Sequence, residues 1–375
     1  MKTQILLVSA QAAPNLLAAA DAELKPECAA LVVSEPMQAR AAALARVLTE
    51  LGVTVRQHRL RNEHDPSKIA EDLLNWFSSL EGEDVYLNLT GGTKLMALTA
   101  LAVAETANWR CFYVDVDTDQ VIWLGRDAPP PRKLNEQVRL RHYLAAYGIV
   151  LDGELQRREP TPSQLAFVQE LLAYYEQYLP ALPLLNEAMD RAEDNRSLDI
   201  ELTDAEADSK SFGRLLEMAR QQRMVMLDGR RLRIESEATR SFLKGGWLEQ
   251  HVFATLAQLH GVLGLRDRAV NVKVRHNDVG NELDVAFLHR NRLHVIECKT
   301  GNLRVNDGAR ANDALFKLAE NTRRLGGLAT RAMLVSYRPL RDSELRLAEL
   351  LQIEVVHGRE VARLREKLRA WCGAR

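Results

Sequence analysis

A chain of 375 residues, 46% of them hydrophobic and 27% charged, has the composition of a globular protein and the length for two or three separate cores. No apolar stretch reaches the 18 or so residues of a membrane span, so we expect no membrane partner. The net charge of −1 conceals an asymmetry. Residues 239–375 hold 24 of the 50 Lys and Arg residues and 15 of the 51 Asp and Glu residues, a net charge of +9, against −10 for residues 1–238. A basic module joined to an acidic one suggests that the C-terminal part meets a polyanion, although a solvated arginine-rich surface has the same signature.

Cysteine usage is sparse and unpatterned. C-x-x-C spacing is absent among the four cysteines, which are Cys28, Cys111, Cys298 and Cys372. This argues against a zinc site or a redox motif. So few cysteines in a long chain fit a reducing compartment, and we expect a cytoplasmic protein.

The first 125 residues alternate between short apolar runs and segments of helical periodicity. The expected strands are Gln4–Ser9, Cys28–Ser34, Val53–Leu60, Asp84–Leu89, Arg110–Val116 and Val121–Leu124. The expected helices are Asn15–Leu24, Met37–Leu51, Ser67–Leu80 and Thr93–Asn108. This alternation predicts a mostly parallel sheet covered by helices on both faces, in a Rossmann-like domain that occupies residues 1–150.

Two proline-rich breaks, at residues 128–131 and 159–162, flank a further expected helix, Asn135–Tyr147. Residues 151–238 then form a connector of a different kind. Its expected helices are Ser163–Tyr178, Leu182–Ala192 and Ser211–Arg223, and an Asp228-Gly229 turn predicts a hairpin after them. Helices followed by a two-stranded wing resemble a winged helix-turn-helix. Because the stretch is not notably basic, a spacer or dimerisation module is at least as good an interpretation as a DNA-reading one.

Residues 239–375 predict a third unit. The expected elements are a helix Gly246–Leu259, strands Val270–Arg275, Glu282–Leu288 and Leu293–Cys298, a helix Asp313–Leu325, a strand Ala332–Ser336, a helix Asp342–Leu350, a strand Ile353–Val356 and a final helix. The order α-β-β-β-α-β is the core topology of restriction-endonuclease-like α/β domains.

Three charged side chains of this unit form a pattern suited to phosphodiester hydrolysis. Asp284 lies in one expected strand, and Glu297 and Lys299 share a face of the next, because side chains two positions apart in a strand point the same way. The turn at residues 289–292 makes the two strands a hairpin, which brings the carboxylates near each other. Charged residues in an otherwise apolar strand are costly unless they serve a site.

Phosphodiester hydrolysis needs charge neutralisation, which a hard divalent cation supplies best. Asp284, Glu297 and the backbone carbonyl of Cys298 would be the ligands of Mn²⁺ or Mg²⁺, since oxygen ligands accept either ion. Lys299 would orient or deprotonate the attacking water, or stabilise charge in the transition state. Glu249 is a further candidate acid for a second metal or a metal-bound water.

Less specific readings of these residues stay open. A lone carboxylate on a strand usually marks an edge or a salt bridge, and for Glu282 a salt bridge is as good an interpretation as metal ligation. Lys317, on the helix after the motif, could touch a phosphate, but an ordinary exposed helix position is favoured. The whole domain could also be an inactive endonuclease-like fold kept for binding.

A second candidate site lies at the strand-to-helix junction of residues 87–94, Leu-Asn-Leu-Thr-Gly-Gly-Thr-Lys. Gly91 and Gly92 permit close backbone approach, Thr93 is a good N-cap, and the helix N-terminus with Lys94 attracts anions. The pattern is neither a Walker A nor a G-x-G-x-x-G motif. It predicts phosphate or nucleotide binding, and the alternative is a glycine turn that caps a packed helix. Ser9, Gln11 and Asn15, at the end of the first strand, would line the same crevice.

Both motifs resemble a known family. Asn88-Leu-Thr-Gly-Gly-Thr-Lys94 is similar to the signature of CRISPR-associated Rossmann fold (CARF) domains. Gly246-Trp-Leu-Glu249, Asn281-Glu-Leu-Asp284 and Glu297-Cys-Lys-Thr300 resemble the PD-(D/E)xK half of the CARF-nuclease effectors of type III CRISPR systems. The resemblance spans nearly the whole chain. The first acid lies in N-E-L-D rather than a literal P-D, a common departure in such domains.

The resemblance implies a homodimer that binds one cyclic oligoadenylate, most often cyclic tetra-adenylate, across its two-fold axis and then degrades RNA or DNA with Mn²⁺ or Mg²⁺. Thr90, Gly91, Gly92, Thr93 and Lys94 would hold the phosphates of the ring. Ser9, Gln11 and Asn15 are assigned only by their position in the fold. Ring size, choice of RNA or DNA, strandedness, choice of metal and cleavage of the activator by the sensor itself are not decided.

Two other functions are compatible with parts of the sequence. The first is a ligand-responsive transcription regulator with a winged-helix reader and a degenerate last domain, against which the intact Asp284, Glu297 and Lys299 argue. The second is a DNA-repair nuclease that needs no messenger. Dependence of cleavage on cyclic oligoadenylate separates it from the effector hypothesis.

Overall fold

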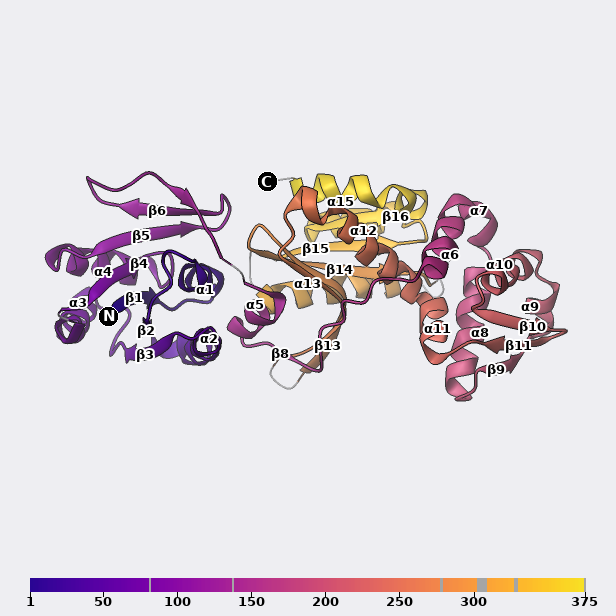
Figure 1. The fold of residues 1–375 in the computed structure, drawn as a ribbon, viewed down its shortest axis with the longest axis horizontal. Coiled ribbons are helices and arrows are strands. Elements are labelled where there is room, and N and C mark those ends of the chain that lie inside the picture. Colours follow the sequence, from indigo (N-terminus) through magenta and orange to yellow (C-terminus); the bar gives the residue numbers. More distant parts are fainter. Residues whose placement is uncertain (81, 137, 277–278, 302–308, 327–329, 374–375) are drawn as a thin grey trace.

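The computed structural model describes all residues except 81, 137, 277–278, 302–308, 327–329 and 374–375. Two α/β domains follow one another along the molecule, and a smaller domain of helices and short strands lies at the end away from the N-terminal domain (Figure 1). Within the described ranges, no helix is long and apolar enough to cross a membrane.

The N-terminal domain is built on a seven-stranded sheet in the order β3-β2-β1-β4-β5-β6-β7, parallel from β1 to β5 with β6 and β7 antiparallel. Its strands are β1 Lys2–Leu7, β2 Cys28–Val33, β3 Thr54–Arg59, β4 Asp84–Asn88, β5 Arg110–Asp115, β6 Gln120–Leu124 and β7 Arg132–Lys133. Its helices are α1 Ala13–Ala20, α2 Gln38–Glu50, α3 Pro66–Phe77 and α4 Lys94–Thr106.

Alternate residues of β1 enter two separate cores. Leu6 joins the core shared with α1 and α2, whereas Ile5 and Leu7 join the core shared with α3 and α4. A strand buried on both faces reads as a continuous apolar run, which is why the sequence pattern located it. The Rossmann-like prediction for this domain is confirmed.

The chain then leaves the first sheet and enters the second. Helix α5 (Leu140–Ala146) packs against α2, and β8 (Val150–Leu151) pairs antiparallel with a strand of the C-terminal sheet. The predicted domain boundary at residue 150 therefore falls within β8. Helix α5 begins at Leu140 rather than at Asn135, because residues 132–135 are held in an extended conformation by the N-terminal domain.

The connector has the order of elements of a winged helix. Its elements are α6 Pro162–Ala173, α7 Tyr175–Tyr178, α8 Leu182–Asp194, β9 Asp199–Glu201, α9 Asp204–Asp208, α10 Lys210–Gln221, β10 Val225–Asp228, β11 Arg231–Ile234 and α11 Glu237–Ser241. The predicted hairpin is confirmed, with Gly229 at φ 59° in its turn. Strand β9, which completes the sheet β10-β11-β9, was not predicted, and the first expected helix is split at Tyr174 (φ −111°, ψ 42°).

The C-terminal sheet has the order β16-β15-β14-β13-β12-β8. Its domain comprises α12 Trp247–Leu263, β12 Asp267–His276, β13 Val279–His289, β14 Arg292–Lys299, α13 Ala309–Gly326, β15 Arg331–Ser336, α14 Asp342–Leu350, β16 Ile353–His357 and α15 Leu364–Gly373. Strands β12, β13 and β14 are antiparallel, and β15 and β16 continue parallel to β14. The predicted α-β-β-β-α-β order is confirmed.

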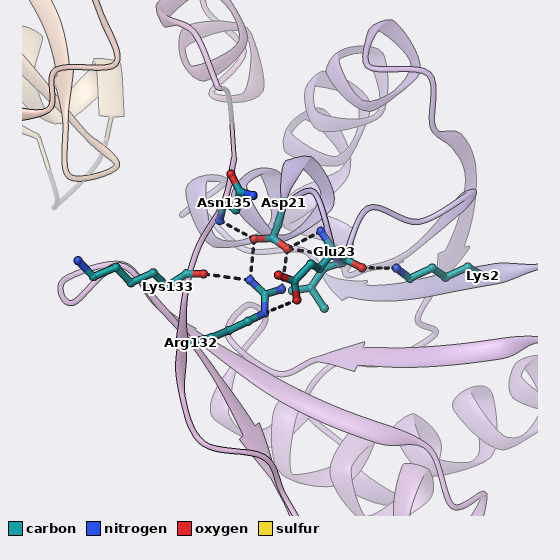
Figure 2. A network of polar contacts seen from close by, with 7 residues as sticks. Lys2, Asp21, Glu23, Arg132, Lys133 and Asn135 are labelled. Carbon is teal, nitrogen blue, oxygen red and sulfur yellow. Dashed lines mark hydrogen bonds and ion pairs between the residues drawn. The ribbon is translucent and has the colours of Figure 1, made fainter.

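A buried carboxylate anchors the segment that leaves the N-terminal sheet (Figure 2). Asp21, fully buried, accepts hydrogen bonds from the Arg132 guanidinium at 2.6 and 3.0 Å and from the backbone N–H of Asn135 at 2.7 Å. Burial alone would raise the pKa of Asp21, but these hydrogen bonds outweigh it and hold the pKa below 3.8. Asp21 therefore stays ionised and fixes where the polypeptide departs towards α5.

Replacing Asp21 by alanine should destabilise the folded protein by about 3 kcal/mol, because Arg132 and the Asn135 N–H lose their buried partner. Since the pKa of Asp21 is lowered, its contribution is present above pH 3.8 and is lost as the pH falls through the folded-state pKa. Denaturant unfolding at several pH values measures this. The matched control Asp152→Ala breaks an exposed pair with Arg275 and should cost less than about 1 kcal/mol. An equal loss from both variants would contradict the anchoring role.

Candidate active site and ligand-binding loop

Strands β13 and β14 form the hairpin that carries the predicted catalytic residues. Arg290 and Asn291 at its turn have φ values of 47° and 57°, the left-handed pair that matches the twist of a two-residue hairpin. Pairing runs from His289 opposite Arg292 to Val285 opposite Ile296. Beyond that pair the strands separate, and the next residues on the two strands are Asp284 and Glu297.

The predicted triad meets at this opening. The backbone N–H of Cys298 donates to Oδ2 of Asp284 at 2.7 Å, and Nζ of Lys299 donates to Oε1 of Glu297 at 2.6 Å. The Asp284 carboxylate thus accepts a backbone N–H of β14 that a continuing ladder would pair with a backbone carbonyl of β13. The structure brings Asp284, Glu297 and Lys299 together, as the spacing predicted.

Helix α12 brings Glu249 to the same place. Burial, and then the neighbouring charges of Asp284 and Glu282, raise the pKa of Glu249 to about 8. Burial and the charge of Glu297 likewise raise the pKa of Asp284 to about 7. Burial disfavours the charged form of Lys299, yet Glu297 and Asp284 outweigh it and raise its pKa. The cluster therefore carries more negative charge than its one ammonium group can balance.

These residues fit a hard divalent cation. In the described part of the chain, no three His, Cys, Asp or Glu side chains converge into a complete metal site by themselves. The available donors are the carboxylates of Asp284 and Glu297 and the backbone carbonyl of Cys298, a set suited to an ion that keeps several waters. A cation there would relieve the repulsion that raises the carboxyl pKa values.

The raised pKa of Glu249 predicts how the stability of the metal-free protein depends on pH. A carboxyl with a raised pKa contributes most to stability below its ordinary pKa of 4.5, and that contribution is lost as the pH rises through about 8. With a chelator present, Tm should fall between about pH 4.5 and 8, and Glu249→Gln should remove much of this fall.

The control for this experiment is Glu235→Gln. Glu235 lines the same cleft, but hydrogen bonds from Ser236 and Thr239 lower its pKa, so its removal should leave the slope of Tm against pH unchanged. A steep fall that persists in Glu249→Gln would show that Glu249 does not hold the proton.

The candidate site opens into a cleft of about 1250 Å³ between the C-terminal domain and the connector. Glu249, Glu282 and Lys299 line one side, and Asn186 and Arg223 of the connector line the other. The sequence did not indicate that the connector lines one side of the cleft, because these connector residues belong to no motif. Glu282, the less certain carboxylate, lies opposite Lys273 in the β12–β13 ladder. Lys317 is exposed on α13 and, among the described residues, is not part of this lining.

The glycine-rich loop between β4 and α4 lies against the end of β1. A Cβ on Gly91 would be 1.9 Å from the carbonyl oxygen of Leu7, so only glycine fits there. Gly92 has φ 71°, and Thr93 caps α4 by accepting from the Met96 N–H at 3.1 Å. Thr93 and Lys94 are exposed. The loop therefore presents a helix N-terminus and a lysine to solvent at the carboxyl end of the sheet, where α/β domains bind ligands.

The residues at the end of β1 are arranged differently from one another. Ser9 and Gln11 form a local turn, with Ser9 Oγ donating to the Gln11 carbonyl at 3.2 Å. Asn15 is buried, and its amide nitrogen donates to the Leu7 carbonyl at 2.8 Å while its oxygen accepts from Asn88 at 3.1 Å. Asn15 thus ties β1 to β4. Ligand binding by all three residues remains a prediction.

Comparisons with known proteins agree with this architecture. Residues 3–143 match the model of the Card1 CARF domain, and residues 235–374 match the model of the Card1-like endonuclease domain. Among proteins with curated descriptions, none matches the chain.

Solved structures share the fold over most or all of the chain. Protein VC1899 from Vibrio cholerae is 25% identical with a TM-score of 0.89, covering 98% of this chain and 97% of that one. Can2 from Sulfobacillus thermosulfidooxidans, in complex with cyclic tetra-adenylate, is 22% identical with a TM-score of 0.80 and full coverage of both chains. A type III CRISPR defence DNA nuclease activated by cyclic oligoadenylate is 22% identical with a TM-score of 0.60, covering 90% of this chain and 45% of that one.

Proposed function

We propose, for a chain that joins a CARF domain of the Card1 type to a Card1-like endonuclease domain, that it is a metal-dependent nuclease activated by cyclic oligoadenylate in type III CRISPR antiviral defence. The observation that carries the proposal is the meeting of Asp284, Glu297 and Lys299 at the open end of one hairpin, in a chain that also holds the exposed Thr93–Lys94 loop. Two structural relatives, Can2 in complex with cyclic tetra-adenylate and a DNA nuclease activated by cyclic oligoadenylate, support the same pairing of functions.

Each residue of the hairpin has a role in this proposal. Mn²⁺ or Mg²⁺ would be held by Asp284, Glu297 and the carbonyl of Cys298, and would supply neutralisation of charge on the phosphate oxygens. Lys299, fixed by Glu297 at 2.6 Å, orients the attacking water and stabilises charge that develops in the transition state. Glu249 holds a proton near neutral pH and can hold a water for the reaction. The cleft of about 1250 Å³ admits the nucleic acid between the nuclease domain and the connector.

The N-terminal domain would bind the activator. The phosphates of the ring meet the backbone N–H groups of Gly91 and Gly92, the N-terminus of α4 and the ammonium of Lys94, while Thr90 and Thr93 flank them. A four-fold repetitive ring such as cyclic tetra-adenylate suits a two-fold site, so the active form is a homodimer. Four free, buried cysteines fit its place in a reducing cytoplasm.

One experiment tests the proposal and names the substrate. Labelled single-stranded RNA, single-stranded DNA and supercoiled plasmid are incubated with Mn²⁺ or Mg²⁺, with and without cyclic tetra- or hexa-adenylate, beside the variant Glu297→Ala. We expect cleavage that requires both the activator and Glu297. Cleavage without the activator would support the nuclease activity and contradict its regulation by cyclic oligoadenylate. No cleavage in any condition would favour the transcription-regulator alternative, for which DNA binding is then measured.

A further inference from the structure

The tip of the catalytic hairpin contacts the sensor domain. Nδ2 of Asn291 donates to Oδ1 of Asp119, and the guanidinium of Arg292 pairs with the carboxylate of Asp117. Asn291 is 3% exposed, so this contact is buried at its centre. Asp117 and Asp119 both belong to the turn between β5 and β6, at the carboxyl end of the parallel sheet.

A hydrogen bond at the end of β5 links the β5–β6 turn to the glycine-rich loop. The backbone N–H of Val114 donates to Oγ1 of Thr90 at 2.7 Å, and that hydroxyl donates to Oδ1 of Asn88 at 2.7 Å. Asp115 then shapes the turn by accepting from the N–H of Asp117 at 3.0 Å and from the hydroxyl of Thr118 at 2.7 Å. Hydrogen bonds and adjacent residues of β5 thus form a continuous path from Thr90 to Asp117.

The hairpin that carries Asn291 and Arg292 at its tip also carries the catalytic carboxylates at its open end. From the tip, β13 and β14 are paired without interruption as far as Val285 opposite Ile296, and the next residues are Asp284 and Glu297. Residues 285–289 and 293–296 are buried. Because β13 also pairs with β12 and β14 with β15, a displacement of the tip is passed along a buried, continuously paired sheet to the open end of the hairpin.

We infer that the contact of Asp117 and Asp119 with Asn291 and Arg292 is the connection through which occupancy of the glycine-rich loop sets the position of Asp284 and Glu297. This inference rests on the proposed function and specifies how its site is regulated. Asn291 and Arg292 are positioning residues, since they touch neither substrate nor metal.

Charge reversal across the exposed part of the contact tests the inference in the full-length protein. Asp117 is 72% exposed and Arg292 25%, so Asp117→Arg leaves the core intact. The measured quantity is the ratio of cleavage rates with and without saturating cyclic tetra-adenylate. We expect Asp117→Arg and Arg292→Asp each to lower this ratio at least about fivefold, and the double variant to restore it to within about twofold of the wild type.

Two further measurements separate regulation from folding. Calorimetric titration with cyclic tetra-adenylate should show that Asp117→Arg still binds the activator, which a collapsed sensor would not. The control Arg56→Glu reverses one member of a comparable pair, with Glu83 at 3.2 Å, inside the sensor domain, and should leave the ratio unchanged.

The outcomes distinguish this inference from the proposed function. If no cyclic oligoadenylate changes the cleavage rate of the wild-type protein, the proposed function and the inference are both overturned. A responsive wild type with single variants that respond equally overturns the inference alone. Loss of response in both single variants without rescue in the double variant also overturns it, because the two charges would then act through other partners.

Discussion

Replacing Lys299 by methionine should lower the rate of phosphodiester cleavage by about a hundredfold to a thousandfold, with the activator and metal saturating. The methionine keeps the apolar part of the side chain and removes the ammonium group that Oε1 of Glu297 holds at 2.6 Å. The transition state then loses a fixed positive charge in a site where burial already disfavours the carboxylates. Initial rates on the substrate identified for the wild type measure the effect.

Lys273→Met is the matched control for this experiment. Lys273 is an exposed lysine in β12 that lines the same cleft, so its loss removes one positive charge without touching the hairpin opening. It should slow cleavage less than about tenfold. Similar losses in the two variants would mean that Lys299 contributes only to the general field of the cleft, and the catalytic assignment would be withdrawn.

Replacing Gly91 by alanine should weaken the binding of cyclic tetra-adenylate by at least about tenfold, equivalent to 1.4 kcal/mol. The new Cβ would lie 1.9 Å from the Leu7 carbonyl oxygen, which already accepts the Asn15 amide at 2.8 Å. The loop must therefore shift away from β1, at a cost of about 1–3 kcal/mol in stability. Calorimetric titration with cyclic tetra-adenylate measures the affinity.

Gly213→Ala provides the comparison for Gly91→Ala. Gly213 lies inside α10 of the connector, where an added Cβ meets nothing within 4 Å. It should leave binding and cleavage at wild-type levels and slightly stabilise the helix. Unchanged affinity in Gly91→Ala would show that the ring is bound away from this loop.

Local sequence patterns predicted most of the secondary structure because each is set by nearby residues. The apolar runs of β1 and β2 indicated two of the parallel strands. The strand patterns on either side of Arg290 and Asn291 predicted the β13–β14 hairpin, and these two strands pair as expected. Short elements escaped prediction. β7, β8 and β9 have two or three residues each, too few to show a periodicity, and they exist because a partner strand offers hydrogen bonds.

The candidate catalytic residues could be predicted for a related reason. Glu297 and Lys299 lie two positions apart on one strand, and Asp284 lies on the neighbouring strand of the same hairpin, so local geometry brings them together. Glu249 comes from a separate helix, and only the packing of α12 against the sheet places it among their charges. The raised pKa values of Glu249 and Asp284 likewise depend on burial by segments distant in sequence.

By itself, the sequence determined two α/β domains, the hairpin with its acids and lysine, and the glycine-rich junction, because periodicity and short-range spacing encode each of them. Only the tertiary structure decided that the connector forms one wall of the cleft and that the hairpin tip contacts the N-terminal domain. Asp119 and Asn291 are 172 positions apart, and neither belongs to a motif. Their contact follows from how two complete domains pack, and the free energy of that packing is distributed over surfaces that no local pattern describes.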